Sequence, residues 1–166
     1  MLAKQTGCGR TPWHFDDHHF PLDTNDVVTA WVPAQPIPLE MGPLSFAYPL
    51  DVHKLVNTVK FEKTGTGYDC GVSNVFLKNN VSVNETPFEL GEVSFHHNLN
   101  FHTASSNRTN RSRVALANTY YRDGARVVSA PTMVSGDWQK FMPNVKPGDI
   151  AVSPLNPICW PVKDKV

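Results

Sequence analysis

The chain has 166 residues, enough for one domain with a hydrophobic core, and its 15 basic residues balance its 15 acidic residues. This balance gives no electrostatic reason to expect nucleic acid or an anionic membrane surface as a partner. No apolar run approaches the ~20 residues that span a bilayer, and residues 1–10 lack the apolar segment of a secretory signal. We therefore expect one cytoplasmic domain over residues 1–166, whose widely spaced cysteines stay reduced.

Short β-rich segments recur along the chain, separated by turns in which the 14 prolines and 10 glycines are frequent. Many short strands with frequent turn signals predict an all-β sandwich or barrel. A short helix is expected around residues 51–59, and an irregular, proline-rich tail from about residue 143. In chain order, the expected strands are residues 13–22, 26–33, 42–48, 72–77, 81–90, 93–102 and 113–121.

The first expected strand carries a candidate metal-binding pair. Alternate residues of a strand share one face, so His14, Asp16 and His18 are expected to point the same way. Two imidazoles and one carboxylate suit Fe(II) and leave coordination positions open for chemistry. A His-x-Asp tripeptide also occurs by chance, so this segment does not decide the matter alone. His18 either contacts a ligand or substrate, or is a paired core histidine.

The expected strand at residues 93–102 has one polar and one mostly apolar face. Alternation places four polar side chains on the first face: His96, Asn98, Asn100 and His102. That face lines a polar cavity or faces solvent, and the periodicity does not separate the two. Of these residues only His102 is a candidate ligand, and His96 is interpreted as structural or surface.

Arg113 begins the expected strand at residues 113–121. If its side chain projects into the interior, it is a buried cation that needs an anion. A carboxylate of a diacid cosubstrate would fit the guanidinium fork through two hydrogen bonds. The alternative is a surface arginine beside Arg108 and Arg111.

Together these segments resemble the phytanoyl-CoA dioxygenase (PhyH) family of Fe(II)- and 2-oxoglutarate-dependent oxygenases, over about residues 12–160. The order of a His-x-Asp pair, a distant histidine and an arginine eleven residues later is more specific than any one part. The matching stretches are Trp13-His14-Phe15-Asp16 with Phe20-Pro21, Thr29-Ala30-Trp31, Met41-Gly42-Pro43-Leu44, residues 91–96 and 102–107, Arg113, and residues 146–149 and 153–157.

The resemblance implies a fold, a site and an activity. The fold is a double-stranded β-helix (a cupin-like jelly roll) with few short helices. The iron ligands would be His14, Asp16 and His102. Arg113 would pair with the far carboxylate of 2-oxoglutarate, and Trp31 would line the cosubstrate site or serve as a core aromatic. The implied reaction uses O2 to hydroxylate a small organic or acyl substrate, because Asp16 stands where related halogenases have a small residue.

The chain also departs from the family pattern. Many members have a serine two residues after the distal histidine, where this chain has Ala104. The hydrogen bond of that serine to the cosubstrate is therefore absent or comes from Thr103 or Ser105. One or more N-terminal strands that usually precede the His-x-Asp segment are expected to be missing. Because an open sheet edge invites pairing, we expect a homodimer through that edge.

Two other functions fit parts of the pattern. A zinc hydrolase can use the same three ligands with water as the fourth, but it gives no reason for Arg113 at its spacing. A non-catalytic, truncated jelly-roll binding protein would keep the fold and lose the pocket. Dependence of turnover on 2-oxoglutarate, and binding of Fe(II) with 2-oxoglutarate, would separate these alternatives.

Overall fold

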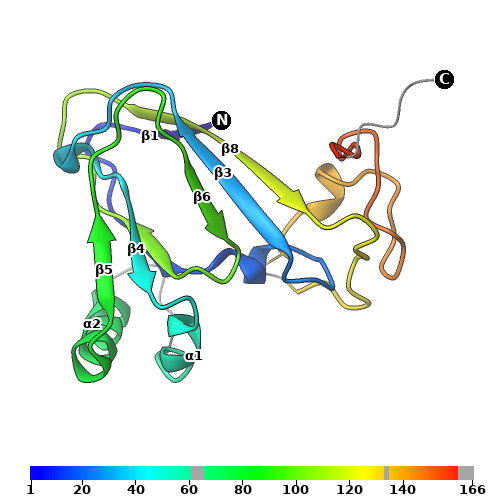
Figure 1. Ribbon diagram of the computed structural model, residues 1–166, viewed down its shortest axis with the longest axis horizontal. Coiled ribbons are helices and arrows are strands. Elements are labelled where there is room, and N and C mark those ends of the chain that lie inside the picture. The colour runs from blue at the N-terminus through cyan, green and yellow to red at the C-terminus, as the bar shows by residue number, and fades with distance from the viewer. Residues whose placement is uncertain (61–65, 133–134, 161–166) are drawn as a thin grey trace. The chain divides into compact units, whose positions relative to one another are not determined.

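The computed structural model describes residues 1–60, 66–132 and 135–160 (Figure 1). The residues group into two compact units. One unit, the jelly-roll unit, consists of Met1–Phe15 and Val28–Thr119, and the second unit consists of Asp16–Val27 and Tyr120–Val166. Each unit has a hydrophobic core of its own. The assignment of residues 1–166 to a single domain stays a prediction.

The jelly-roll unit consists of two four-stranded antiparallel sheets. The first sheet has the order β1-β8-β3-β6, with β1 Leu2–Lys4, β8 Arg113–Tyr121, β3 Val27–Pro33 and β6 Ser94–His97. The second has the order β2-β7-β4-β5, with β2 Thr11–His14, β7 His102–Ala104, β4 Leu44–Tyr48 and β5 Ser82–Glu85. Strands that are neighbours in a sheet are distant in the chain, as in a double-stranded β-helix. The predicted all-β jelly roll is confirmed.

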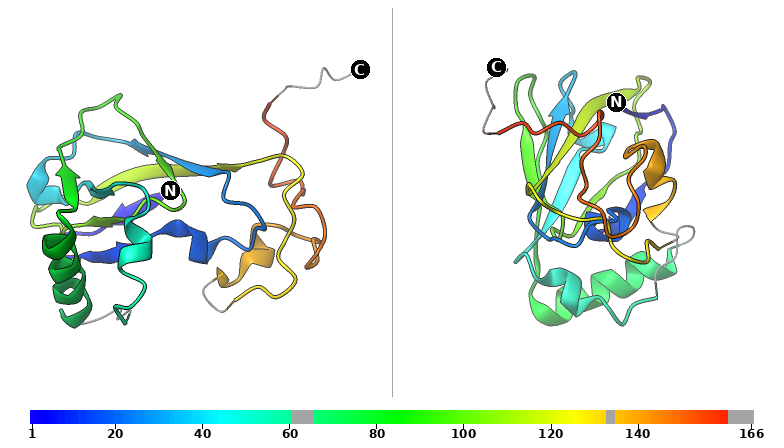
Figure 2. Two further views of the ribbon diagram at one scale, coloured as in Figure 1. Left: turned by 60° about the horizontal axis from the view of Figure 1, so that its bottom comes forward. Right: turned by 90° about the vertical axis from the view of Figure 1, so that its right-hand side faces the viewer.

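One hydrophobic cluster fills the space between the two sheets. It joins Trp31 and Ala115 of the first sheet to Phe46 and Ala104 of the second. Successive residues of a strand point to opposite faces, so Ala47, next to Phe46, belongs to a different cluster. That cluster contains residues of α1 (Val52–Leu55) and α2 (Gly67–Asn79), which lie beside each other (Figures 1 and 2). The two faces of β4 therefore pack against different clusters, one between the sheets and one that includes the two helices.

The second unit has little regular structure. Its described residues include the 3-10 helices η1 (Asp16–His19), which comes shortly after β2 in the chain, and η4 (Trp138–Lys140). Isolated bridges join Leu22 to Val127 and Arg126 to Ile150. The core of this unit consists of Leu22, Val27, Ala125, Val127, Trp138, Met142, Val145 and Ala151. Residues 143–160, in the tail that was expected to be irregular, carry turns and isolated bridges.

The first of the expected strands is wrong in part, and the one at residues 72–77 is wrong in whole. The first ends at His14, and Asp16 begins η1, so simple alternation does not hold at the His-x-Asp segment. Residues 72–77 lie inside α2, where Tyr68, Val72 and Phe76 are buried. Their spacing of four residues is that of a helix face. Three buried residues among polar neighbours form only a weak sequence pattern, so the helix depends mainly on tertiary packing. The helix expected around residues 51–59 is present as the shorter α1.

The expected strand at residues 93–102 is wrong as one element. The chain forms β6, turns at residues 98–99, and continues as β7 in the other sheet. The four polar side chains of this segment are nevertheless buried, so the solvent-facing alternative is wrong. A jelly-roll chain crosses between sheets, and alternation along one supposed strand does not describe such a crossing.

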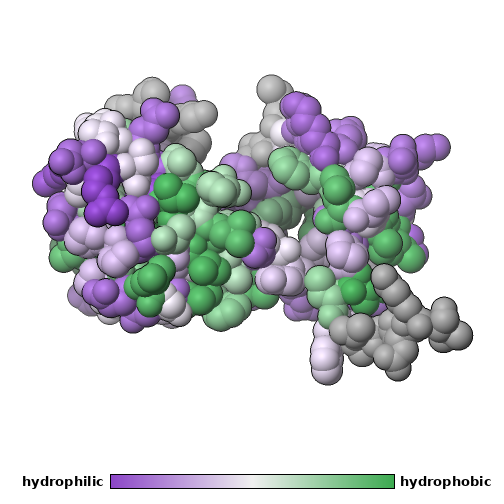
Figure 3. All heavy atoms as spheres, turned by 90° about the horizontal axis from the view of Figure 1, so that it is seen from above, coloured by the Kyte–Doolittle hydropathy of each residue, from purple (hydrophilic) through white to green (hydrophobic). Residues whose placement is uncertain are grey.

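The edge strands of the two sheets are β1 and β6 in the first and β2 and β5 in the second. Apolar side chains reach the surface in several patches (Figure 3), and Phe95 of β6 is 70% exposed. Pairing of two copies through a sheet edge stays a prediction. Among the described residues, no helix is both long and apolar enough to cross a bilayer.

Candidate metal and cosubstrate site

Two histidines face each other across neighbouring strands. β2 pairs with β7, and His14 lies opposite His102. Between Thr11 and His14 the register shifts by one residue against the partner strand, as at a β-bulge. Such a bulge re-aims a side chain, and here the two imidazole rings have centroids 4.2 Å apart.

The hydrogen bonds of the two imidazoles determine which nitrogen can bind a metal. Nδ1 of His14 lies 2.8 Å from the Pro12 carbonyl oxygen, and Nδ1 of His102 lies 2.9 Å from that of Asn100. A carbonyl oxygen only accepts, so Nδ1 must carry the proton in each ring. The lone pair of each neutral imidazole then lies on Nε2, as in most metal-binding histidines.

Asp16 completes a set of three donors. One ligand atom from each of His14, Asp16 and His102 lies within 4.8 Å of the other two. His102 is buried, and the other two side chains are half-buried. Asp16 comes close because the chain turns into η1 after His14, and not because of strand alternation. Two imidazoles and one carboxylate are the donor set of non-haem Fe(II) oxygenases.

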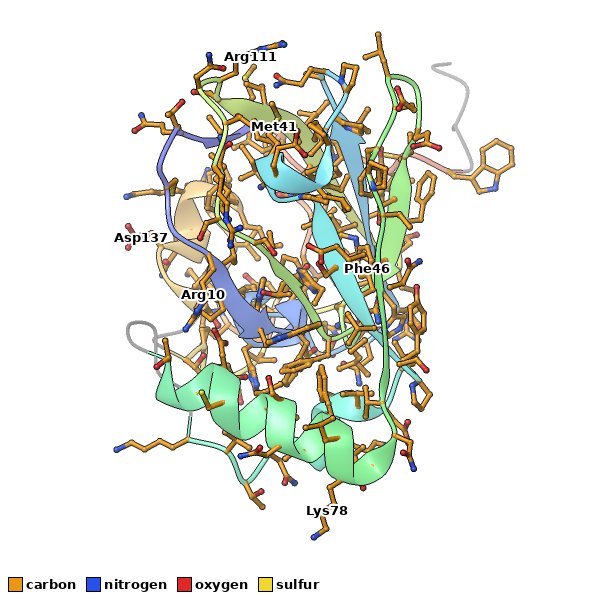
Figure 4. All side chains as sticks on the ribbon, turned by 90° about the vertical axis from the view of Figure 1, so that its left-hand side faces the viewer. Arg10, Met41, Phe46, Lys78, Arg111 and Asp137 are labelled. Atoms are coloured by element: carbon orange, nitrogen blue, oxygen red, sulfur yellow. The ribbon has the colours of Figure 1, made fainter. Side chains whose placement is uncertain are left out.

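Aromatic rings form one side of this site. Phe46, labelled in Figure 4, lies opposite His102 in the pairing of β4 with β7, and their ring centroids are 5.9 Å apart. His96 is 5% exposed and its ring lies 4.9 Å from that of His102. Of the two interpretations of His96, structural or surface, burial favours the structural one, and the crossing from β6 to β7 brings its ring beside His102.

Arg113 lies in the interior and not at the surface. Its side chain is 7% exposed, and Nη1 donates to the Gly42 carbonyl oxygen. The guanidinium carbon lies 5.4 Å from the centre of the Trp31 ring, a cation–π contact. Nε is buried without a hydrogen-bond partner among the described residues, and none of their carboxylates pairs with Arg113. Burial lowers the pKa of Arg113, which indicates an uncompensated cation.

Trp31 is a core aromatic, and its role in lining a cosubstrate site stays a prediction. It is 2% exposed within the cluster between the sheets, and it contacts Arg113. Its ring also meets that of Phe88 edge-on, with centroids 5.1 Å apart. The ring is therefore held in place by core packing while its face supports the guanidinium.

Lys4 is a second buried cation, which the sequence pattern did not indicate. Lys4 of β1 lies directly opposite Arg113 of β8 and is 6% exposed. Burial, and secondarily the charge of Arg113, lowers the pKa of Lys4 to about 8. From sequence alone, a lysine near the start of a chain is expected at the surface. The pairing of β1 with β8 places Lys4 in the interior of the jelly-roll unit.

Both expected substitutes for the missing serine are engaged elsewhere. The hydroxyl of Thr103 donates to the Thr11 carbonyl oxygen, and that of Ser105 donates to a Glu85 carboxylate oxygen 3.1 Å away. The side chain of Lys4 reaches the backbone at this position, where its Nζ donates to the carbonyl oxygen of Ala104 over 3.1 Å.

The loop between His102 and Arg113 is held by one buried amide. Asn107 is 1% exposed, and its Nδ2 donates to the carbonyl oxygens of Lys4 and Arg111. Its Oδ1 accepts from the backbone N–H and the hydroxyl of Thr109. The loop that brings Arg113 to the interior is thereby tied to β1.

Gly42 allows the closest backbone approach beside Arg113, and Gly42→Ala tests it. Gly42 has φ +73°, and a Cβ there would overlap the carbonyl oxygen of Ser105. We expect a loss of about 2–4 kcal/mol in the free energy of unfolding, from the left-handed backbone and the overlap. The measurement is urea denaturation. Gly91→Ala is the control, because Gly91 has φ +97° and open space around it, so only the backbone term of about 1–2 kcal/mol remains. Equal losses in both variants would contradict the close approach.

The model of one protein family, phytanoyl-CoA dioxygenase (PhyH), matches residues 1–115. The chain belongs to this family. The match covers His14, Asp16, His102 and Arg113 and confirms the resemblance seen in the sequence. No curated protein matches this family member.

Solved structures agree with the family in fold. This PhyH-family chain is similar to the non-heme alpha ketoglutarate dependent carbocyclase SnoK from nogalamycin biosynthesis, with TM-score 0.69 and 23% identity over 93% of the chain. It is also similar to the epimerase SnoN from the same biosynthesis, with TM-score 0.68 and 20% identity over 93% of the chain. The aligned part is 57% of SnoK and 58% of SnoN, so the chain spans less than two thirds of either.

Proposed function

We propose that this PhyH-family chain is an Fe(II)- and 2-oxoglutarate-dependent oxygenase that hydroxylates a small organic or acyl substrate. One observation supports the proposal: the sequence motif that contains the His-Asp-His donor set also contains a buried arginine, and this arginine has no carboxylate partner among the described residues. A metal alone would explain the first feature and leave the arginine unexplained. A metal with a diacid cosubstrate explains both.

The residues present fit the iron. His14 and His102 each offer Nε2, because Nδ1 is engaged with a backbone carbonyl, and Asp16 offers a carboxylate oxygen. These three protein donors would leave the metal open to the cosubstrate and O2. Iron held there would supply O2 activation coupled to conversion of 2-oxoglutarate to succinate and CO2.

The remaining residues bind, orient and exclude water. Arg113 would bind the far carboxylate through its guanidinium, whose Nη1 and contact with Trp31 fix its direction. A cation that is already desolvated and oriented binds an anion with little reorganisation. Phe46 and the buried His96 form a wall beside His102 that keeps bulk water from the reacting centre.

The similar enzymes SnoK and SnoN are both described as alpha ketoglutarate dependent, which agrees with this proposal. Neither the zinc hydrolase nor the non-catalytic binding protein finds support in the family match.

The proposal predicts metal-dependent cosubstrate binding and turnover. Anaerobic calorimetry should show one Fe(II) or Mn(II) per chain, and 2-oxoglutarate should bind more tightly in its presence. With Fe(II), O2 and a panel of small organic and acyl compounds, succinate release should rise above the uncoupled background for the true substrate, and mass spectrometry should find one added oxygen atom. Hydrolytic turnover with Zn(II) and without 2-oxoglutarate would contradict the proposal, and so would the absence of any metal binding.

A further inference from the structure

Two buried cations lie side by side in the jelly-roll unit. Lys4 and Arg113 are directly opposite each other in the pairing of β1 with β8. Side chains that are opposite on antiparallel strands share a face, with Cβ atoms about 4.5–5.5 Å apart. Both residues are at least nine-tenths buried. Like charges in this arrangement repel and destabilise the fold unless an anion lies between them.

Among the described residues, no carboxylate forms a salt bridge with Lys4 or Arg113, and the acidic group that raises their pKa values is the thiol of Cys8. Nζ of Lys4 donates to the carbonyl oxygens of Ala104 and Ser105, at 3.1 and 2.6 Å, and lies 3.4 Å from the hydroxyl of Thr11. Arg113 donates to the carbonyl oxygen of Gly42, and its buried Nε has no partner among the described residues. Every one of these acceptors is neutral. Two positive charges therefore stand desolvated in one place, and they need negative charge from outside the described chain.

The position of Lys4 also suggests which group replaces the serine that many family members have at the position of Ala104. Family members often have a serine there, and the hydroxyls of Thr103 and Ser105 are bound to other groups. Nζ of Lys4 reaches the backbone of this same position from β1. Lys4 therefore brings an ammonium group to the backbone of this position.

We propose that Lys4 is a second binding residue for the far carboxylate of the oxoacid, acting beside Arg113 in place of the missing serine. This inference rests on the proposed function. It names the cosubstrate class: a pair of cations selects a dicarboxylic oxoacid over a monocarboxylic one, because only the former brings a carboxylate to the pair.

The proposal has a consequence for pH. The pKa of Lys4 is lowered to about 8, mainly by burial, then by the charge of Arg113 from β8, and Cys8 after β1 acts in the opposite direction. Below pH 8 the free protein has both cations. As pH rises through about 8, Lys4 loses its proton, so binding of a dicarboxylate must weaken with pH. Arg113 stays charged throughout this range.

The decisive experiment uses the metal-free full chain with glutarate, which has both carboxylates of 2-oxoglutarate but no keto group. Calorimetry should show binding to the wild-type chain at pH 7. Lys4→Met should weaken it by roughly 10- to 100-fold, the effect of losing one charge-assisted hydrogen bond. Lys4→Arg should restore it. Lys78→Met is the matched control, because Lys78 of α2 is exposed and points away from the sheets (Figure 4).

The pH profile keeps the proposal falsifiable if Lys4→Met does not fold. The affinity of the wild-type chain for glutarate should fall between pH 7 and 9.5, while that of Lys4→Arg should stay nearly constant. Equal profiles for the two proteins would overturn the proposal. So would unchanged glutarate affinity in Lys4→Met, which would reduce Lys4 to a link between β1 and β7, and so would no glutarate binding by the wild-type chain. Failure of the proposed function looks different: glutarate binds to the cation pair, but Fe(II)-dependent succinate release is absent.

Discussion

Asp16→Ala should remove metal binding and turnover while the chain stays folded. The change deletes the only carboxylate of the donor set of His14, Asp16 and His102. Loss of an outer-shell partner already weakens metal binding by about 10- to 100-fold, so loss of a ligand should exceed ~100-fold. Mn(II) calorimetry measures the affinity, and succinate release with Fe(II) should fall to background. Because Asp16 is half-buried at the start of η1, its truncation leaves no large cavity.

Asp17→Ala is the matched control for this variant. Asp17 is the next residue of the same 3-10 helix and lies outside the donor set. Its removal changes the net charge equally, so metal affinity should stay within about threefold of wild type, the loss of one nearby charge in high dielectric. Equal losses in the two variants would show that the carboxylates act only through overall charge. Unchanged metal affinity in Asp16→Ala would contradict the assignment of Asp16 as a ligand.

Arg113→Met should weaken oxoacid binding strongly without destabilising the metal-free chain. Truncating one partner of a buried charge pair costs about 2–5 kcal/mol of binding free energy, which raises Kd by roughly 30-fold to several thousandfold. The free protein behaves differently, because a buried cation without a carboxylate partner is unfavourable and a methionine of similar length fills its place. The free energy of unfolding of the metal-free variant should therefore equal or exceed that of wild type, despite the lost hydrogen bond to Gly42.

Calorimetry with 2-oxoglutarate and Mn(II), together with urea denaturation, measures the two halves of this prediction. Arg111→Met is the control, since Arg111 is an exposed residue of the preceding loop (Figure 4). A variant that binds the oxoacid normally would remove Arg113 from the site. A variant that unfolds far more easily, with Arg111→Met unchanged, would indicate a structural arginine whose charge the chain itself compensates.

The sequence predicted the candidate site better than it predicted the elements that hold it. The spacing of His14, Asp16, His102 and Arg113 resembled the family, and the structure brings the three metal donors together. The reason given for His14 and Asp16 was wrong, because β2 ends between them. A family motif identifies residues that come together in the fold, whatever the local backbone conformation. Strand alternation applies only within a regular strand, and here a bulge and a 3-10 helix interrupt it.

The errors in the fold have the same origin. Val72 and Phe76 belong to α2 because packing against Trp13 and Phe101 stabilises a helix that intrinsic propensity alone leaves marginal. The segment at residues 93–102 was taken as one strand because its alternation continues through the turn that separates β6 from β7. The local sequence pattern does not show that β6 and β7 belong to different sheets.

By itself the sequence determined the β-rich class, through composition and turn residues, while the resemblance of its motifs indicated the family and the site residues. The tertiary structure alone decided which polar groups are buried and which charges become neighbours. Lys4 shows the difference most clearly: 109 positions separate it from Arg113 in the chain, and only the pairing of β1 with β8 places them side by side. The electrostatic energy of two charges depends on the distance between them and on their burial, and the residue order alone specifies neither.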